Sequence, residues 1–123
     1  MRTLAAALTF ALAGTAAAQP VLTVLTYDSF VSEWGPGPAI EQAFEAGCGC
    51  DLRLVGAGDG AALLARLRLE GARSEASVVL GLDTNLTAQA AATGLFAPHG
   101  RTGRWDLPVA WDDPLFLPYD WGW

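Results

Sequence analysis

Aromatic and acidic residues follow three hydrophobic runs of the chain, where each run gives way to a turn. The first run ends in Tyr27, the second leads to Asp59 and Gly60, and the third ends at Asp83. An aromatic ring stacks on flat or positively charged groups, and carboxylates attract a cation. Gly60 has no side chain and lets its backbone approach a ligand closely. With the indole of Trp34, these residues predict noncovalent binding of a small cationic molecule.

Each of these residues also has an ordinary structural interpretation. Asp59 and Asp83 stand where an N-cap belongs, and an aspartate at a helix start commonly does no more than cap it. Tyr27 at a strand end can bury its ring and keep its hydroxyl in water. Trp34 can seat the following Gly-Pro-Gly-Pro turn on the sheet. The residues by themselves leave both interpretations open.

Other kinds of chemistry lack the residues that they need. His99 is the single histidine, and no Ser-His-Asp arrangement is evident. Cys48 and Cys50 can pair in an oxidising compartment or ligate a metal, but a closed zinc site needs four ligands. No Walker-type phosphate loop and no Gly-x-Gly-x-x-Gly fingerprint is present. We therefore expect no catalytic residue, no metal, no cofactor and, because the chain is acidic, no nucleic acid partner.

Alternating strand and helix patterns supply the frame. Short apolar and β-branched runs predict strands at 21–26, 51–55 and 77–82. Helices are predicted between and after them, at 38–46 with a stop at Gly47, at 60–70 with a stop at Gly71, and at 84–93 with a stop at Gly94. This order predicts an α/β fold, a mostly parallel sheet with helices on both faces. The polar turns then share the carboxyl edge of the sheet, where such folds bind ligands, and the cysteines lie at the opposite edge.

The two ends of the sequence differ from this middle part. Residues 1–18 have a basic start, an apolar run and a small-residue Ala-Ala-Ala end, which predicts a signal peptide and export. Its removal takes away Arg2 and leaves six arginines against thirteen acidic residues, a formal charge of −7 over residues 19–123. After Phe96 the periodicity is lost, and 116–120 is predicted to be a short strand or a segment crossing to another lobe.

A series of motifs resembles the opening of the bacterial thiamine-binding periplasmic proteins, within the type 2 periplasmic binding protein superfamily. The run Val-Leu-Thr-Val-Leu-Thr-Tyr-Asp-Ser-Phe at 21–30, followed by Trp-Gly-Pro-Gly-Pro at 34–38, carries most of the resemblance. It continues through Ala-Phe-Glu-Ala at 43–46, Cys-x-Cys at 48–50, Asp-Gly at 59–60, Leu-x-Arg-Leu-Arg-x-Glu-Gly at 64–71, Val-Val-Leu-Gly-Leu-Asp at 78–83, Thr-Gly-Leu-Phe at 93–96 and Pro-Tyr-Asp at 118–120.

The resemblance implies the first lobe of a two-lobed binding protein, 19–123, with the second lobe missing and the chain truncated. It implies that a monomer holds thiamine or a thiamine phosphate in the periplasm, using Tyr27 and Asp59-Gly60, and delivers it to the membrane permease of an ABC importer. Half of a clamp is expected to bind weakly, because ligand pockets bury most of the ligand surface. The alternatives are another cationic ligand such as a polyamine or ferric iron, a truncated fragment without function, and a thiamine-processing enzyme with a cysteine nucleophile.

Overall fold

A parallel sheet of three strands organises the computed structural model, which describes residues 18–103 and 105–120. The strands β1 (Val21–Thr26), β2 (Asp51–Gly56) and β3 (Val78–Val79) lie in the order β2-β1-β3. β1 pairs along its whole length with β2 and through its last part with β3. The predicted parallel α/β fold is confirmed. The predicted signal peptide, apart from Ala18, lies outside the described residues.

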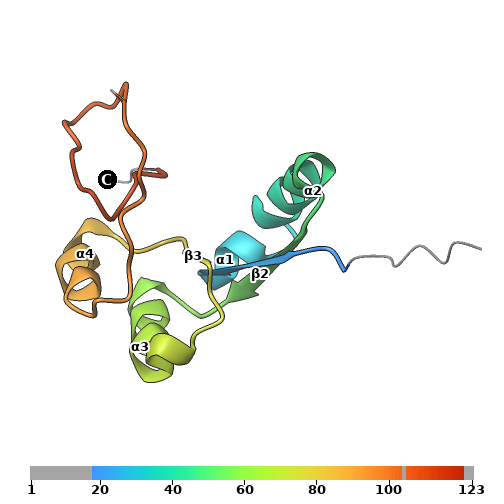
Figure 1. Ribbon diagram of the computed structural model, residues 1–123, viewed down its shortest axis with the longest axis horizontal. Coiled ribbons are helices and arrows are strands. Elements are labelled where there is room, and N and C mark those ends of the chain that lie inside the picture. The colour runs from blue at the N-terminus through green and yellow to red at the C-terminus, as the bar shows by residue number, and fades with distance from the viewer. Residues whose placement is uncertain (1–17, 104, 121–123) are drawn as a thin grey trace, which may run out of the picture.

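In the described residues, four helices and one 3₁₀ turn connect and cover the strands. They are α1 (Asp28–Val31), α2 (Gly37–Cys48), α3 (Gly60–Glu70), the 3₁₀ turn η1 (Gly71–Arg73) and α4 (Thr84–Ala91). The chain moves from β1 outward to β2 and then back past β1 to β3, so right-handed crossovers place α2 and α3 on opposite faces. Figure 1 shows α1 and α2 above the strands and α3 below them.

The third strand is shorter than the sequence predicts. The predicted range 77–82 is paired as a strand only at Val78–Val79. Leu80 still donates its N–H to the carbonyl of Leu25 at 2.9 Å, but at Gly81 the backbone turns away with φ +106°. That conformation belongs to glycine and ends the extended run. The apolar run continues to Leu82, but the extended backbone conformation ends at Gly81.

The helix after the Gly-Pro-Gly-Pro turn is longer than predicted. Gly47 does not stop α2, which runs through Cys48 and ends at Gly49 in the left-handed conformation, φ +62°. Cys48 and Cys50 form a disulfide across this turn, and the N–H of Cys50 points at Cys48 Sγ at 3.1 Å. The helix end is therefore set by the Cys-Gly-Cys turn. The one-turn helix α1 is too short for any periodicity and was not predicted.

Leucines of α3 form the centre of the core. Leu63, Leu64 and Leu67 are buried, as their helical spacing predicts, and Leu63 and Leu67 pack against Leu25 of β1. By contrast, the apolar face of α2 is only partly covered, since Phe44 stays 45% exposed. No helix among the described residues has the length and apolar character that a membrane crossing requires.

One buried hydroxyl at the end of β1 has no partner. Thr26 is fully buried, and among the described residues its Oγ1 makes no hydrogen bond. Replacing Thr26 with valine, which has the same shape, removes this unsatisfied group. We expect the free energy of unfolding to rise by about 1 kcal/mol. Urea unfolding of the two proteins measures this, and a clear loss of stability in Thr26→Val would show that the hydroxyl is satisfied in solution.

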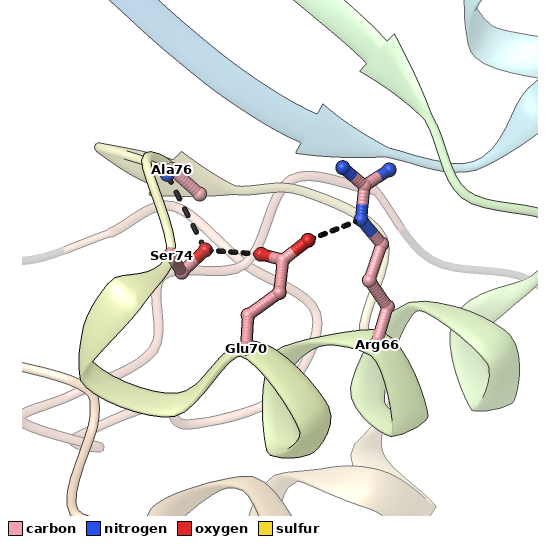
Figure 2. A network of polar contacts seen from close by, with 4 residues as sticks. All are labelled: Arg66, Glu70, Ser74 and Ala76. Carbon is pink, nitrogen blue, oxygen red and sulfur yellow. Dashed lines mark hydrogen bonds and ion pairs between the residues drawn. The ribbon is translucent and has the colours of Figure 1, made fainter.

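A polar network fastens the connection between α3 and β3. Arg66 Nε contacts Glu70 Oε1 at 2.7 Å, and Ser74 Oγ donates to Glu70 Oε2 at 2.7 Å (Figure 2). Ser74 Oγ in turn accepts the N–H of Ala76 at 3.4 Å, on the approach to β3. One carboxylate therefore links the last turn of α3 to the segment that leads into the sheet.

The same network predicts how stability responds to acid. Hydrogen bonds from Arg66 and Ser74, helped by the arginine charge, lower the pKa of Glu70 below its ordinary value of 4.5. The folded protein thus binds this proton less readily than the unfolded chain, so the network stabilises the fold above pH 4.5 and its contribution is lost as pH falls through the lowered pKa. Glu70→Gln is expected to be less stable than wild type at pH 7, with a difference that shrinks below pH 4.5. The same loss of stability in Glu70→Gln at pH 7 and below pH 4.5 would contradict this. The same pH-dependent loss in the control Glu75→Gln would also contradict it.

The segment after α4 has no strand or helix in its described residues, but it is held by specific contacts. His99 Nε2 lies 3.0 Å from the carbonyl of Asp113, and His99 Nδ1 accepts the N–H of Arg101 at 2.9 Å. Trp111 Nε1 donates to the carbonyl of Phe116 at 2.8 Å. Of the two predictions for 116–120, a strand is not found.

Candidate functional site

The ends of the three strands meet at one edge of the sheet. β1 leads into α1 and α2, whereas β3 leads into α4, which packs on α3. In open α/β sheets, ligands bind at the carboxyl ends of neighbouring strands whose connections diverge in this way. Tyr27 follows β1 directly, and Gly81 lies two residues after β3. Asp59 ends the turn after β2, and Gly60 begins α3. The topology therefore brings together the turns that the sequence predicted to carry a site.

The packing at this edge leaves little room for a side chain at Gly81 or at Gly60. A Cβ atom added to Gly81 would lie 2.8 Å from Tyr27 Cε1 and nearer still to Tyr27 Cδ1. A Cβ atom added to Gly60 would lie 3.0 Å from the carbonyl oxygen of Gly81 and 3.3 Å from Leu86 Cδ1. Tyr27, Gly81 and Gly60 thus pack in sequence along the edge, one from each of the three turns.

Two of the predicted acidic residues cap helices. Asp59 Oδ1 accepts the N–H of Ala62 at 2.8 Å at the start of α3, and Asp83 Oδ1 accepts the N–H of Asn85 at 2.8 Å at the start of α4. The capping interpretation is therefore correct for both. Both residues are also exposed at the carboxyl edge. A cap that uses one carboxylate oxygen leaves the negative charge in place for a cation.

A third aspartate, Asp28, locks the first two turns to each other. Its Oδ1 accepts the N–H of Gly58 at 2.9 Å, and its own N–H donates to the carbonyl of Gly58 at 2.8 Å. This role of Asp28 could not be predicted, because an acidic residue shortly after a strand does not reveal a partner thirty residues away.

Aromatic rings extend from Tyr27 towards the end of the described chain. The rings of Tyr27 and Phe30 meet edge to face with centroids 5.6 Å apart, and Phe30 meets Tyr119 in the same way at 6.0 Å. Burial raises the pKa of Tyr27, and the nearby Tyr119 and Asp120 raise it further. The segment 116–120 therefore reaches the carboxyl edge, a placement that no local pattern in the sequence predicts.

Trp34 is far more exposed than Tyr27. It lies in the turn between α1 and α2 and is 82% exposed. The indole therefore does not seat this turn on the sheet, and the structural interpretation of Trp34 is wrong. Its role in ligand binding remains a prediction.

Features elsewhere in the described part of the chain do not make a second site. A shallow hollow of about 340 Å³ lies between the ends of α3 and α4, where Arg68 already donates to Gln89 at 3.2 Å. The Cys48–Cys50 disulfide lies between α2 and the start of β2, at the amino edge of the sheet. In the described residues, no three His, Cys, Asp or Glu side chains come together as metal ligands would.

Comparison with known proteins identifies the relatives. The chain is 54% identical over 106 residues to the thiamine-binding periplasmic protein of Escherichia coli strain K12, 52% over 112 residues to that of Brucella suis biovar 1 and 44% over 115 residues to that of Haemophilus influenzae. The chain is homologous to the thiamine-binding periplasmic proteins. These alignments cover 85%, 90% and 92% of the chain. No family model matches the sequence.

A solved structure described as a periplasmic thiamin binding protein supports the same relationship. It superposes with a TM-score of 0.73 at 54% identity and covers 78% of the chain. The chain spans about a third of the length of the thiamine-binding periplasmic proteins that it matches, and 30% of the solved chain. The resemblance read from the sequence motifs is confirmed. All of these relatives are named as binding proteins, and none of them as an enzyme.

Proposed function

We propose that this chain forms one wall of a thiamine-binding site in the periplasm, at the carboxyl edge of its sheet. The observation that carries the proposal is the meeting of Tyr27, Gly81 and Gly60 at that edge, in a chain 54% identical to a thiamine-binding periplasmic protein. The predicted signal peptide at 1–18 exports the protein, and an ABC importer permease receives the ligand. Thiamine is a transported ligand in this proposal, and no cofactor is needed.

Recognition rests on an aromatic ring surrounded by negative charge. Thiamine carries a flat thiazolium cation, which is suited to the ring of Tyr27 and to the carboxylates of Asp59 and Asp83. Gly60 lets the backbone at the start of α3 approach the ligand. Trp34, exposed in the α1–α2 turn, offers a second aromatic ring to the ligand. These five residues are the proposed ligand contacts of the chain.

Binding without turnover is the function that these residues favour. A thiamine-processing enzyme of the kind considered above needs a free cysteine thiolate next to its substrate, and Cys48 and Cys50 are paired in a disulfide. They also lie at the amino edge of the sheet, across from Tyr27. An assay of thiamine consumption with wild type and Cys48→Ser tests this. Turnover that is lost in Cys48→Ser would replace the binding proposal with an enzymatic one.

Ligand-observed NMR with residues 19–123 separates the ligand classes. Thiamine, spermidine and ferric citrate are offered singly and in competition, and we expect saturable binding of thiamine that spermidine does not displace. Asp59→Asn keeps the N-cap, because asparagine caps as well as aspartate, and removes the charge. It is expected to weaken binding, while Asp51→Asn at the amino edge is not. Preference for spermidine or iron, or equal effects of the two variants, would contradict the proposal.

A further inference from the structure

The backbone at Gly81 lies against one edge of the ring of Tyr27. The Cδ1–Cε1 edge of the ring occupies the space where any other residue at 81 would place its Cβ, 2.8 Å from Cε1. Carbon atoms in contact normally stay about 3.5–4.0 Å apart. A methyl group at position 81 therefore requires the ring to move by roughly an ångström or the β3 turn to open.

The ring of Tyr27 is half-buried and has a second neighbour in Phe30. Phe30 is 2% exposed and contacts Tyr27 edge to face, and Phe30 also contacts Tyr119 edge to face. Gly81 is itself confined, because its carbonyl oxygen lies against Gly60 at the start of α3. Tyr27 thus contacts both a buried phenyl ring and the backbone of Gly81, so a group added at residue 81 is expected to displace the ring towards solvent.

We propose that Gly81 is a positioning residue, which sets the orientation of the Tyr27 ring and its distance from Gly60. Its part in ligand recognition rests on the function proposed above, whereas its effect on the ring does not. A simpler role is that Gly81 only ends β3, since φ +106° alone favours glycine. The two roles differ in one respect: positioning acts through Tyr27, and ending the strand does not.

A double-mutant cycle distinguishes these roles without any ligand. Gly81→Ala is expected to destabilise the protein strongly, and the loss is expected to shrink in a Tyr27→Ala background, where the clash is absent. If Gly81→Ala alone fails to fold, recovery of a folded double variant gives the same answer. Gly94→Ala is a control for a positive φ without a neighbouring ring, because Gly94 has φ +69° and open space around it. An equal loss in both backgrounds would overturn the proposal.

Tyrosine absorbance gives a second reading of the ring itself. The chain has two tyrosines, so in a Tyr119→Phe background the tyrosinate signal at alkaline pH belongs to Tyr27. This background removes the contribution of Tyr119 to the raised pKa of Tyr27 and leaves those of burial and Asp120. Burial raises the pKa of Tyr27, and Gly81→Ala is expected to bring that pKa back towards 10.0 by displacing the ring into solvent. Gly94→Ala is expected to leave it unchanged. An unchanged Tyr27 titration in Gly81→Ala would show that residue 81 does not position the ring.

Ligand titrations then connect the ring to recognition. Gly81→Ala is expected to weaken thiamine binding about tenfold, the scale of a displaced aromatic contact, and to cause no further loss beyond Tyr27→Ala. Independent losses from the two changes would contradict positioning through Tyr27. Absence of thiamine binding by the wild type would instead refute the proposed function, and the stability cycle and the tyrosine titration would still decide the role of Gly81.

Discussion

Replacing Tyr27 with alanine is expected to weaken thiamine binding by about tenfold or more, because a cation over a desolvated aromatic ring gains on the order of 1–2 kcal/mol. Tyr27→Phe keeps the ring and its edge-to-face contact with Phe30. It is expected to retain most of the affinity. Ligand-observed NMR titrations of the three proteins measure the difference.

Trp34→Ala is the informative comparison. The sequence predicts both rings as ligand contacts, but only Tyr27 is held in place by neighbouring residues, whereas Trp34 is 82% exposed. Ordering a free side chain on binding costs entropy, so we expect a smaller loss from Trp34→Ala than from Tyr27→Ala. A larger loss of thiamine affinity in Trp34→Ala than in Tyr27→Ala, or no loss in Tyr27→Ala, would show that the site is not centred on the turn after β1.

Replacing Leu63 with alanine is expected to lower the free energy of unfolding by about 2–5 kcal/mol. Leu63 is fully buried and packs with Leu25 of β1 and Leu67 of the same helix. Its truncation leaves a cavity between α3 and the sheet, which such a small core cannot close easily. Urea unfolding followed by circular dichroism measures the loss.

The same helix supplies the control. Leu69 lies two turns along α3 from Leu63 and is 80% exposed. Leu69→Ala makes the same chemical change in the same helix without a cavity, and we expect a stability change within about 0.5 kcal/mol. Similar losses at both positions would mean that the surface around Leu69 is covered in solution, and that the packing described for α3 is incomplete.

Hydrophobic spacing and helix-stop residues predicted the order of elements well. The strand at 21–26, the leucine core of α3 and the two aspartate caps all depend on neighbours within a few residues, and the structure has each of them. The predictions were wrong where the backbone conformation sets the end of an element. The sequence predicted Gly47 as the stop of this helix, whereas α2 ends at Gly49 in the Cys-Gly-Cys turn.

The candidate site was only half predictable for the same reason. Tyr27 and Asp59-Gly60 could be proposed as site residues because they follow hydrophobic runs, and the carboxyl edge of the sheet collects such positions. Asp28, Gly81 and Tyr119 act through partners far along the chain, namely Gly58, Tyr27 and Phe30. A single sequence carries no signal for such pairs, since their spacing follows from the order β2-β1-β3 and not from any local period.

A calorimetric titration of thiamine into folded residues 19–123 decides whether this sheet edge recognises thiamine. We expect saturable heat with weak affinity, on the order of millimolar, because one wall buries only part of a ligand. The heat is expected to fall in Asp59→Asn and to persist in Asp51→Asn. No saturable heat from a well-folded sample, or heat that Asp59→Asn leaves unchanged, would contradict a thiamine site at the carboxyl edge.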